Sequence, residues 1–420
     1  MASALKDVLV VDLTHVVAGP MATKTLRDLG ARVVKVENPN MRNPSAPGDV
    51  TRYFEPIMQR ADGSGWQSAY FAMMNGGKES IVLQLDPQLE GSREDRTVFE
   101  AMLARADVLV ENFRPGVLGS LGYSWETLHE RFPRLVLASL SGFGQTGPYS
   151  YRKAVDTIIQ GMSGFITATG FQEVPVKVGT TVSDLLAGVY CATGVLAALH
   201  QRHRSGLGCY VDVAMLDTSF AFHGRELVSY QVRGHEPPRL GNTSPIGVYP
   251  FDVFECRDGR SFSVNCASNE AFSAFCRILG APELAADERF RRPRDRWANR
   301  EALRTAITDN TSRWDRDALL GKFLELRGSG SFPVGPVNGF ADIIADPQLQ
   351  HRGMLRPTRD GRLLVPGSPI KILGESGGDP VEGADVAPDP PELDADGSKI
   401  RAEFAPAAPP AARAPPRSRM

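Results

Sequence analysis

One acidic residue stands out between residues 139 and 164, where the sequence reads SLSGFGQTGPYSYRKAVDTIIQGMSG. Three glycines and a proline enter this stretch and small residues close it, so the backbone can turn tightly on both sides of Asp156. A carboxylate that is accessible on a loop can act as a covalent nucleophile. In the simpler interpretation Asp156 is an N-cap that accepts hydrogen bonds from a helix beginning at Thr157. The residues alone leave both roles open.

Residues with phosphate-binding chemistry follow two apolar runs elsewhere in the chain. Arg114, in the hexapeptide ENFRPG, carries a planar guanidinium with five donors that suits phosphate, and Asn112 adds neutral donors. His15 follows the first apolar run, where it either contacts a ligand or only bonds to the backbone. Open α/β sheets bind small molecules at the carboxyl ends of their strands. We therefore expect His15, Arg114 and Asp156 to lie at one edge of a sheet.

Short β-branched runs alternate with helical patterns in the first half of the chain. Residues 8–13 predict a buried strand, 21–29 a helix and 32–37 a second strand, which together form a βαβ unit. No GxGxxG follows the first strand, so NAD binding is disfavoured. Further strands are predicted at 81–85, 107–111, 135–139 and 206–214, and helices at 96–106 and 182–203. The fold class is α/β, with a Rossmann-like parallel sheet in a large domain.

The pattern changes after about residue 220. Apolar runs at 248–256 and 260–265 are joined through Asp258-Gly259, which is a hairpin signal, and helices are predicted at 270–279, 300–310 and 317–327. We predict that residues 1–224 form the first part of the large domain and that 225–330 form a smaller α/β domain. Residues 331–400 return to the large domain, and 401–420 are Pro/Ala/Arg-rich and predicted to be disordered.

Composition narrows the classes of partner. The net charge of −2 gives no field for nucleic acid or an anionic membrane, so neither is expected as a partner. We see no apolar run near the ~20 residues that span a bilayer. The five cysteines are widely spaced without a CxxC, which favours reduced thiols over disulfides or zinc, and no metal is expected. With no signal-peptide pattern at the N-terminus, we expect a cytoplasmic protein.

Several motifs resemble one family. The segment FGQTGPY…D…QGMSG is similar to the active-site segment of class III CoA-transferases, the superfamily of formyl-CoA transferase, carnitine CoA-transferase and α-methylacyl-CoA racemase. The turn THVVAGP at 14–20, the hexapeptide ENFRPG, and the later segments PVGPVN and DPQLQHRG resemble other parts of the family in the same order. The resemblance covers roughly residues 5 to 395. It implies that Asp156 is the family's nucleophile.

The resemblance also implies ligands and partners. Coenzyme A and acyl-CoA are expected as substrates, with no tightly bound cofactor, and the family's members are interlocked homodimers. Lys78 lies in a segment that resembles the family's N-x-G-K-x-S-I, where it either meets a CoA phosphate or is a solvated lysine. The expected CoA-binding residues are His15, Val16, Val17, Ala18, Lys78, Asn112, Phe113 and Arg114.

The implied reaction is transfer of CoA from an acyl-CoA such as succinyl-CoA to a carboxylic acid, through an aspartyl-CoA thioester on Asp156. Racemases of this superfamily resemble the segment but have His where this chain has Val155, which weakens that alternative. A non-catalytic acyl-CoA-binding protein is a second alternative, and the presence of Asp156 argues against it.

The substrate acids are less defined. Formyl-CoA:oxalate transferases have Gln where this chain has Val17, and their run of consecutive glycines is absent around Gly241, so formate and oxalate are disfavoured. We expect a dicarboxylate pair such as succinate with another short diacid. Arg225, Arg233 or Arg239 could bind its distal carboxylate, or each could be a surface charge.

Overall fold

The computed structural model describes residues 4–39, 45–59, 63, 65–372 and 386–405. The chain forms two compact units. The larger comprises the described residues within Met1–Phe165, Lys177–Val228 and Gln348–Met420, and the smaller comprises Ile166–Val176 and Ser229–Pro347. The chain therefore returns to the larger unit at Gln348, later than the predicted residue 331.

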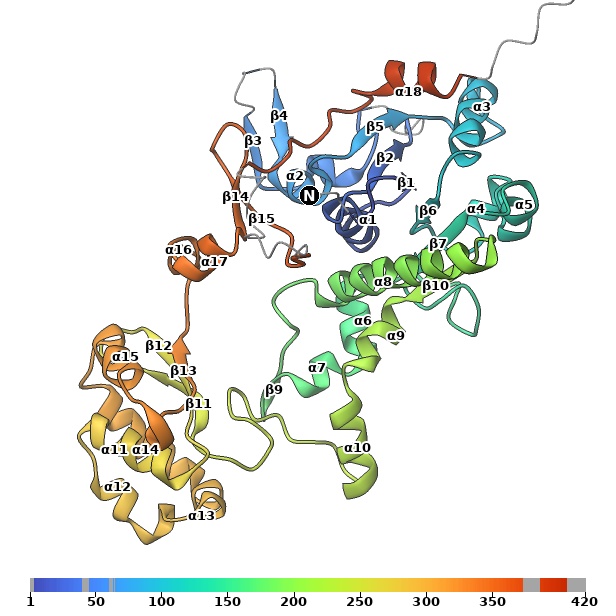
Figure 1. The fold of residues 1–420 in the computed structure, drawn as a ribbon. Coiled ribbons are helices and arrows are strands. Elements are labelled where there is room, and N and C mark those ends of the chain that lie inside the picture. Colours follow the sequence, from blue (N-terminus) through green and yellow to red (C-terminus); the bar gives the residue numbers. More distant parts are fainter. Residues whose placement is uncertain (1–3, 40–44, 60–62, 64, 373–385, 406–420) are drawn as a thin grey trace, which may run out of the picture. The chain divides into compact units, whose positions relative to one another are not determined.

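A six-stranded parallel sheet forms the centre of the larger unit (Figure 1). Its order is β10-β7-β6-β1-β2-β5, so the chain builds outward from β1 to β5, returns to β6 and builds outward in the other direction. This is a doubly wound arrangement with a topological switch point between β1 and β6. The parallel α/β fold predicted from the sequence is confirmed. The strands are β1 (Leu9–Asp12), β2 (Arg32–Glu37), β5 (Glu79–Val82), β6 (Val108–Glu111), β7 (Val136–Ser141) and β10 (Tyr210–Ala214).

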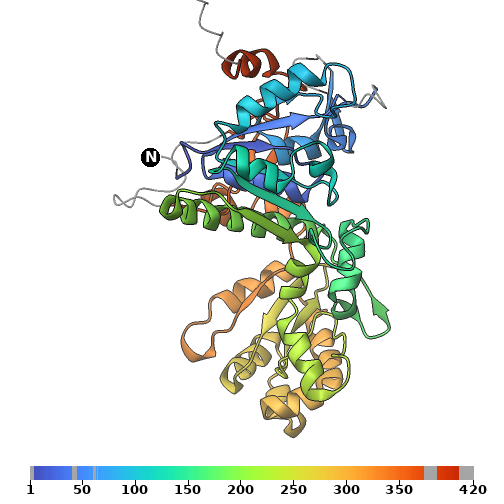
Figure 2. The ribbon, with the colours of Figure 1, turned by 90° about the vertical axis from the view of Figure 1, so that its right-hand side faces the viewer.

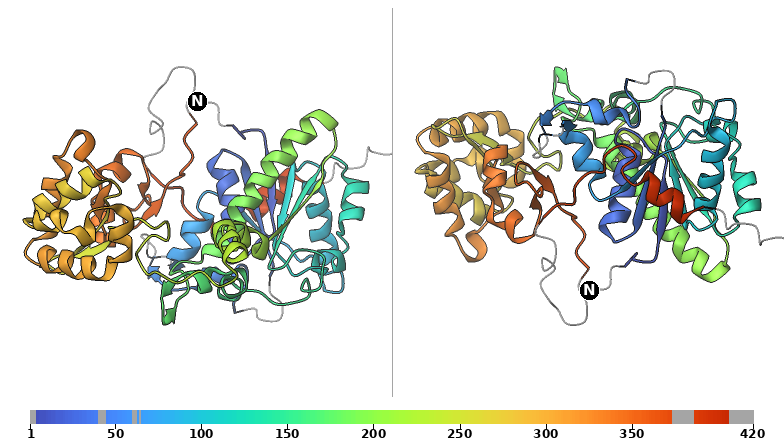
Figure 3. Two further views of the ribbon diagram at one scale, coloured as in Figure 1. Left: turned by 90° about the horizontal axis from the view of Figure 1, so that it is seen from below. Right: turned by 90° about the horizontal axis from the view of Figure 1, so that it is seen from above.

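Helices cover both faces of this sheet (Figures 2 and 3). Successive strand residues point to opposite faces, so Val10 packs with α1 (Ala18–Asp28) and α8 (Val182–Ser205). Val11 packs on the other face with α3 (Ser92–Leu103), α4 (Val117–Ser120), α5 (Trp125–Arg131) and α18 (Gly397–Glu403). Both faces are thus buried, which explains why the strands read as continuous apolar runs.

One face of the long apolar helix α8 packs into the core of the larger unit. Ala187, Cys191 and Val195 are fully buried against the sheet and α1. Gly188 permits the close contact with α1, since a Cβ there would lie 2.6 Å from the carbonyl oxygen of Ala18. By length and composition alone α8 could cross a membrane, which contradicts the expectation that no apolar run approaches that length.

The last described helix completes the larger unit. Ile400 and Phe404 of the α18 segment are buried beside Phe99. The predicted disordered tail at 401–420 therefore begins too early, because Arg401–Glu403 are helical and Phe404 is in the core. Residues 406–420 lie outside the described part of the chain. Before α18, side chains of Asp394 and Asp396 accept hydrogen bonds from Val82 N and Ser80 N, the outer edge of β5.

The smaller unit contains an antiparallel sheet in the order β11 (Phe251–Glu255), β12 (Ser261–Asn265), β13 (Val334–Pro336). The predicted hairpin is confirmed, with Gly259 at a φ of 72° in its turn. Because β13 pairs with β12, this segment belongs to the smaller unit. Helices α11 (Asn269–Leu279), α14 (Arg300–Thr311) and α15 (Arg316–Leu324) bury an aromatic core against the sheet.

The remaining elements are short. The other strands are β3 (Ile57–Gln59), β4 (Trp66–Ser68), β8 (Gly170–Phe171), β9 (Val174–Pro175), β14 (Leu355–Pro357) and β15 (Leu364–Pro366). The other helices are α2 (Ala69–Asn75), α6 (Asp156–Ser163), α7 (Phe165–Ala168), α9 (Met215–Ala221), α10 (Gly224–Arg233), α12 (Glu283–Ala286), α13 (Pro293–Ala298), α16 (Phe340–Ile344) and α17 (Pro347–His351), with 3-10 turns at Val50–Tyr53, Glu288–Phe290 and Gly328–Gly330. All five cysteines are free.

Candidate active site

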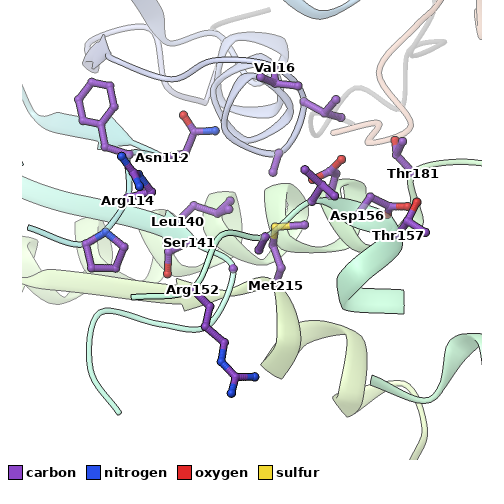
Figure 4. A pocket seen from close by; sticks show the side chains of 18 of the residues that line it. Val16, Asn112, Arg114, Leu140, Ser141, Arg152, Asp156, Thr157, Thr181 and Met215 are labelled. Carbon is purple, nitrogen blue, oxygen red and sulfur yellow. The ribbon is translucent and has the colours of Figure 1, made fainter. Parts of the chain in front are cut away.

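A pocket of about 580 Å³ lies at the carboxyl ends of β1, β6 and β7, beside the switch point of the larger unit. Figure 4 shows Asp156 and Thr181 on one side of it and Asn112 and Arg114 on the other, with Val16 above. The expected convergence of Arg114 and Asp156 at one sheet edge is therefore observed. The expected residues that line the pocket are Val16, Val17, Ala18, Asn112, Phe113, Arg114 and Asp156.

The turn after β1 is held in an unusual conformation. Val16 has a φ of 69°, which is strained for a β-branched residue, and it faces the pocket. The two preceding residues are fixed through their backbones: the Asn112 side chain accepts from His15 N and donates to His15 O, both at 2.8 Å. Lys35 Nζ donates to Thr14 O at 2.6 Å. Asn112 thus positions the turn as well as lining the pocket.

Lys78 does not line the pocket. Its ammonium group is fully buried, 3.0 Å from Asp12 Oδ2 and bonded to the side-chain oxygens of Thr23 and Asn75. Burial lowers the pKa of Lys78 to about 8, against the opposing effect of Asp12. Burial would raise the pKa of Asp12, but Lys78 and Lys35 lower it to about 2. Lys78 is therefore not the solvated lysine that the sequence allowed, and it stabilises the core beneath the β1 turn.

His15 and Phe113 face a second, smaller pocket of about 170 Å³. Their rings lie 5.6 Å apart, and only Phe113 also lines the larger pocket. Burial and the nearby Lys35 lower the pKa of the His15 imidazole, which is therefore neutral at neutral pH. The sequence did not predict that His15 and Val16 line different pockets, because adjacent residues in a turn can face opposite sides.

Arg114 is exposed at the rim of the larger pocket. Among the described residues its guanidinium has no hydrogen bond or ion pair, so all five donors are available to a ligand. Arg152 also lines the pocket, but it stacks on Tyr149 with its guanidinium carbon 3.7 Å from the ring centroid. Figure 4 shows the Arg152 side chain pointing away from Asp156.

Asp156 opens α6 and is 7% exposed. The sequence had suggested that Asp156 is either an N-cap or a loop residue. Both positions are wrong, because the residue before the helix is Val155 and Asp156 is the first helical residue. Its Oδ1 accepts from Ser183 N at 2.9 Å and its Oδ2 accepts from Gln160 Nε2 at 2.6 Å. Both donors are neutral, and no described Lys or Arg side chain forms an ion pair with this carboxyl group.

Gly142 at the end of β7 explains how α6 reaches this position. A Cβ at Gly142 would lie 2.1 Å from Cβ of Ala154, so a side chain there would push away the segment that carries Asp156. The Gly-rich entry noticed in the sequence thus acts through close backbone approach as well as through turn geometry.

Two further pocket residues near Asp156 carry titratable groups that the sequence did not assign to the site. Tyr70 from α2 and Asp184 from the first turn of α8 both line the pocket near Asp156. Burial, and then the negative charge of Asp156, raise the pKa of Asp184 to about 7. Burial and Asp184 also raise the pKa of Tyr70. The proximity of Asp184 to Asp156 arises from tertiary packing, so the local sequence pattern around either residue does not reveal it.

Two of the arginines considered for a distal carboxylate are already engaged. Arg225 pairs with Glu226, and Arg239 donates to the carbonyl oxygens of Thr167, Phe171 and Gln172. In the described parts of the chain, no group of three His, Cys, Asp or Glu side chains is arranged to hold a metal ion.

Comparison with known proteins agrees with this geometry. Residues 5–396 match the model of CoA-transferase family III. An acetyl-CoA:oxalate CoA-transferase of Acetobacter aceti is 43% identical over 94% of this chain and 95% of its own. A succinyl-CoA:mesaconate CoA-transferase of Haloarcula hispanica is 39% identical over 88% of this chain and 90% of its own. The crystal structure of a CAIB/BAIF family protein from Brucella suis superimposes with a TM-score of 0.84 at 34% identity, covering 96% of this chain and all of that one.

Proposed function

Because the chain belongs to CoA-transferase family III and is a CoA-transferase, we propose that it moves CoA from a short acyl-CoA to a small dicarboxylic acid through a thioester on Asp156. The observation that carries this proposal is the Asp156 carboxylate, which lines the pocket and is held by two neutral donors. A carboxylate that lines a pocket can attack a carbonyl carbon and form a covalent intermediate.

The reaction proceeds through four nucleophilic substitutions at a carbonyl carbon, and it requires no net proton transfer. Asp156 attacks the thioester carbon, the C–S bond breaks, and a mixed anhydride and the CoA thiolate form. The thiolate attacks the Asp156 carbonyl carbon, which gives aspartyl-CoA and releases the donor as a carboxylate. The acceptor carboxylate attacks this thioester, and the thiolate then attacks the acceptor's carbonyl carbon in the new anhydride, which regenerates Asp156. Splitting the exchange in this way lowers each barrier.

The CoA moiety is proposed to bind along the turn after β1 and at Arg114. The unpaired guanidinium of Arg114 suits a phosphate group. The first turn of α1 begins at Ala18, in the pocket wall, and free backbone amides at such an end favour anions. Val16, Val17 and Phe113 supply apolar surface between these polar groups.

The acids are proposed from the names of the similar transferases. The similar transferases are named for oxalate and mesaconate, and a further relative of Agrobacterium fabrum for succinate and glutarate. The relative named for oxalate weakens the sequence argument that disfavoured oxalate. Acetyl-CoA with oxalate is therefore the first pair to test, and succinyl-CoA with mesaconate or glutarate is the second.

The experiment is to incubate the protein with acetyl-CoA or succinyl-CoA, trap it with hydroxylamine or borohydride, and locate the modification by mass spectrometry. We expect a modification on the peptide containing Asp156 and new acyl-CoA product when the acceptor is added. Asp156→Ala should lose both by more than about 10³-fold, since it removes the nucleophile, and should still bind CoA. Asp360→Ala, a substitution at an exposed aspartate outside the pocket, is the control. Retained turnover in Asp156→Ala would remove this residue from the mechanism.

A further inference from the structure

Two of the three carboxyl groups that line the pocket, those of Asp156 and Asp184, lie in the first turns of helices. Asp156 begins α6, and Asp184 lies in the first turn of α8. The hydrogen bond from Ser183 N to Asp156 Oδ1, at 2.9 Å, holds this first turn directly against Asp156. Asp184 is the next residue after Ser183 and lines the same pocket with Tyr70 and Thr181. The proposed mechanism gives Asp184 no role.

The surroundings of Asp184 disfavour its charged form. The charged or titratable groups that line the pocket with it are Asp156 on α6, Tyr70 on α2, Glu55, Lys177, Arg114 and Arg152. In the described structure the Asp184 carboxyl group forms no ion pair and no hydrogen bond. Burial and the negative charge of Asp156 raise its pKa to about 7, so much of it is protonated at neutral pH. A buried carboxylic acid that stays neutral can donate a hydrogen bond.

We propose that Asp184, as the neutral acid, donates a hydrogen bond to the oxyanion that forms when Asp156 attacks the thioester. This inference rests on the proposed function. When the bond from Asp156 to the carbonyl carbon forms, the C=O electron pair moves to oxygen and faces the Asp184 O–H. The pair returns when the C–S bond breaks, and the proton remains on Asp184 throughout. No net proton transfer is required.

The alternative, in which Asp184 acts as a second carboxylate, is physically weaker. Two ionised carboxylates in one pocket repel each other, and both would oppose the negative charge that develops on the substrate oxygen. A neutral donor at this position stabilises that charge instead. Loss of one oxyanion donor lowers kcat by about 10²–10³-fold in enzymes where it has been measured.

The test compares Asp184→Asn, Asp184→Ala and wild type over pH 5.5 to 9. In wild type, kcat should fall as pH rises through about 7, because the neutral acid is present below that value and lost above it. Asp184→Asn keeps a donor that does not titrate, so it should retain kcat within about tenfold without the alkaline decline, whereas Asp184→Ala should lose about 10²-fold. Asp217→Asn, in the first turn of α9 and outside the pocket, is the matched control and should leave the profile unchanged.

Two results would overturn the proposal. In the first, Asp184→Asn is as inactive as Asp184→Ala, which would indicate that a carboxylate is required. In the second, both variants have the kcat and the pH profile of wild type. Absence of CoA transfer by wild type with every donor and acceptor would instead contradict the proposed function. In that case the proposal is still tested by following the carbon-13 NMR signal of the Asp184 carboxyl group as a function of pH. The signal is assigned by its loss in Asp184→Asn. Titration near neutral pH supports the neutral acid, and titration in the ordinary aspartate range overturns it.

Discussion

At the scale of single residues, the residues that line the pocket differ from charged residues elsewhere in whether they form ion pairs. Lys78 and Asp12 neutralise each other in the core, and Arg225 is paired at the surface. Asp156 and Arg114 have no ion-pair partner among the described residues, although both line the pocket. Burying a carboxyl group costs free energy unless it is hydrogen-bonded, as Asp156 is, whereas the exposed guanidinium of Arg114 is open to a ligand. These are therefore the two residues for which we propose direct functional roles.

Arg114→Ala should raise KM for acyl-CoA by about 10- to 100-fold, because it removes charge-assisted hydrogen bonds to a phosphate worth about 1.5–3 kcal/mol. We expect a much smaller change in kcat, since the contact is remote from the reacting carbonyl. Steady-state kinetics at varied acyl-CoA measures both constants. Arg93→Ala, at an exposed arginine on α3, serves as the control, and an unchanged KM in Arg114→Ala would make Arg114 structural.

At the scale of elements, the β1 turn is shaped by a residue from another strand. Asn112 follows β6, yet its side chain forms two hydrogen bonds with the backbone of His15. These bonds place Val16–Ala18 in the pocket wall although Val16 has a strained φ. The switch point between β1 and β6 thus brings two sequence-distant turns together as one binding surface.

Asn112→Ala should lower the free energy of unfolding by about 1–3 kcal/mol, because it leaves buried backbone groups of His15 without partners. It should also raise KM for acyl-CoA, since the turn is no longer fixed. Urea denaturation and steady-state kinetics measure the two effects. Val16→Gly is the contrasting variant: relief of about 1–3 kcal/mol of strain offsets the entropy cost of glycine, so stability should be maintained. Equal stability of Asn112→Ala and wild type would show that the two hydrogen bonds contribute little.

The sequence predicted the sheet well, because buried parallel strands are short apolar runs and 32–37 coincides with β2. It also predicted Asp156, Asn112 and Arg114 as site residues, and all three line the pocket, while their roles stay predictions. It did not predict the burial of Lys78 or the proximity of Asp184 to Asp156, since both depend on contacts between segments distant in the chain. A local sequence pattern indicates which face of one helix or strand is buried. It does not indicate which residues of a distant element pack against that face.

At the scale of the whole molecule, the larger unit is assembled from three separate parts of the chain. Its core includes Phe404 and Ile400 from the α18 segment, which lie beside residues of the first half of the chain. Arg32 connects the same parts through ion pairs with Glu79 and Glu403. The sheet and α18 therefore stabilise each other and should unfold together.

Phe404→Ala should lower the free energy of unfolding of the larger unit by about 3–5 kcal/mol, as expected for a buried aromatic side chain. Urea denaturation followed by circular dichroism measures this change. Lys399→Ala on the same helix, where the side chain is mostly exposed, should change stability by less than about 1 kcal/mol. Equal stability of the two variants would show that α18 is only peripherally attached.

The position of α18 in the chain has a consequence for synthesis. During translation the ribosome produces β5 early, then the other strands of the sheet and all of the smaller unit, and α18 only afterwards. Until Asp394 and Asp396 emerge, the outer amides of Ser80 and Val82 have no partners, and the site that receives Phe404 stays open. Such an exposed edge can pair with another nascent chain. The growing polypeptide thus passes through a stage in which the smaller unit is complete while the larger unit still lacks α18.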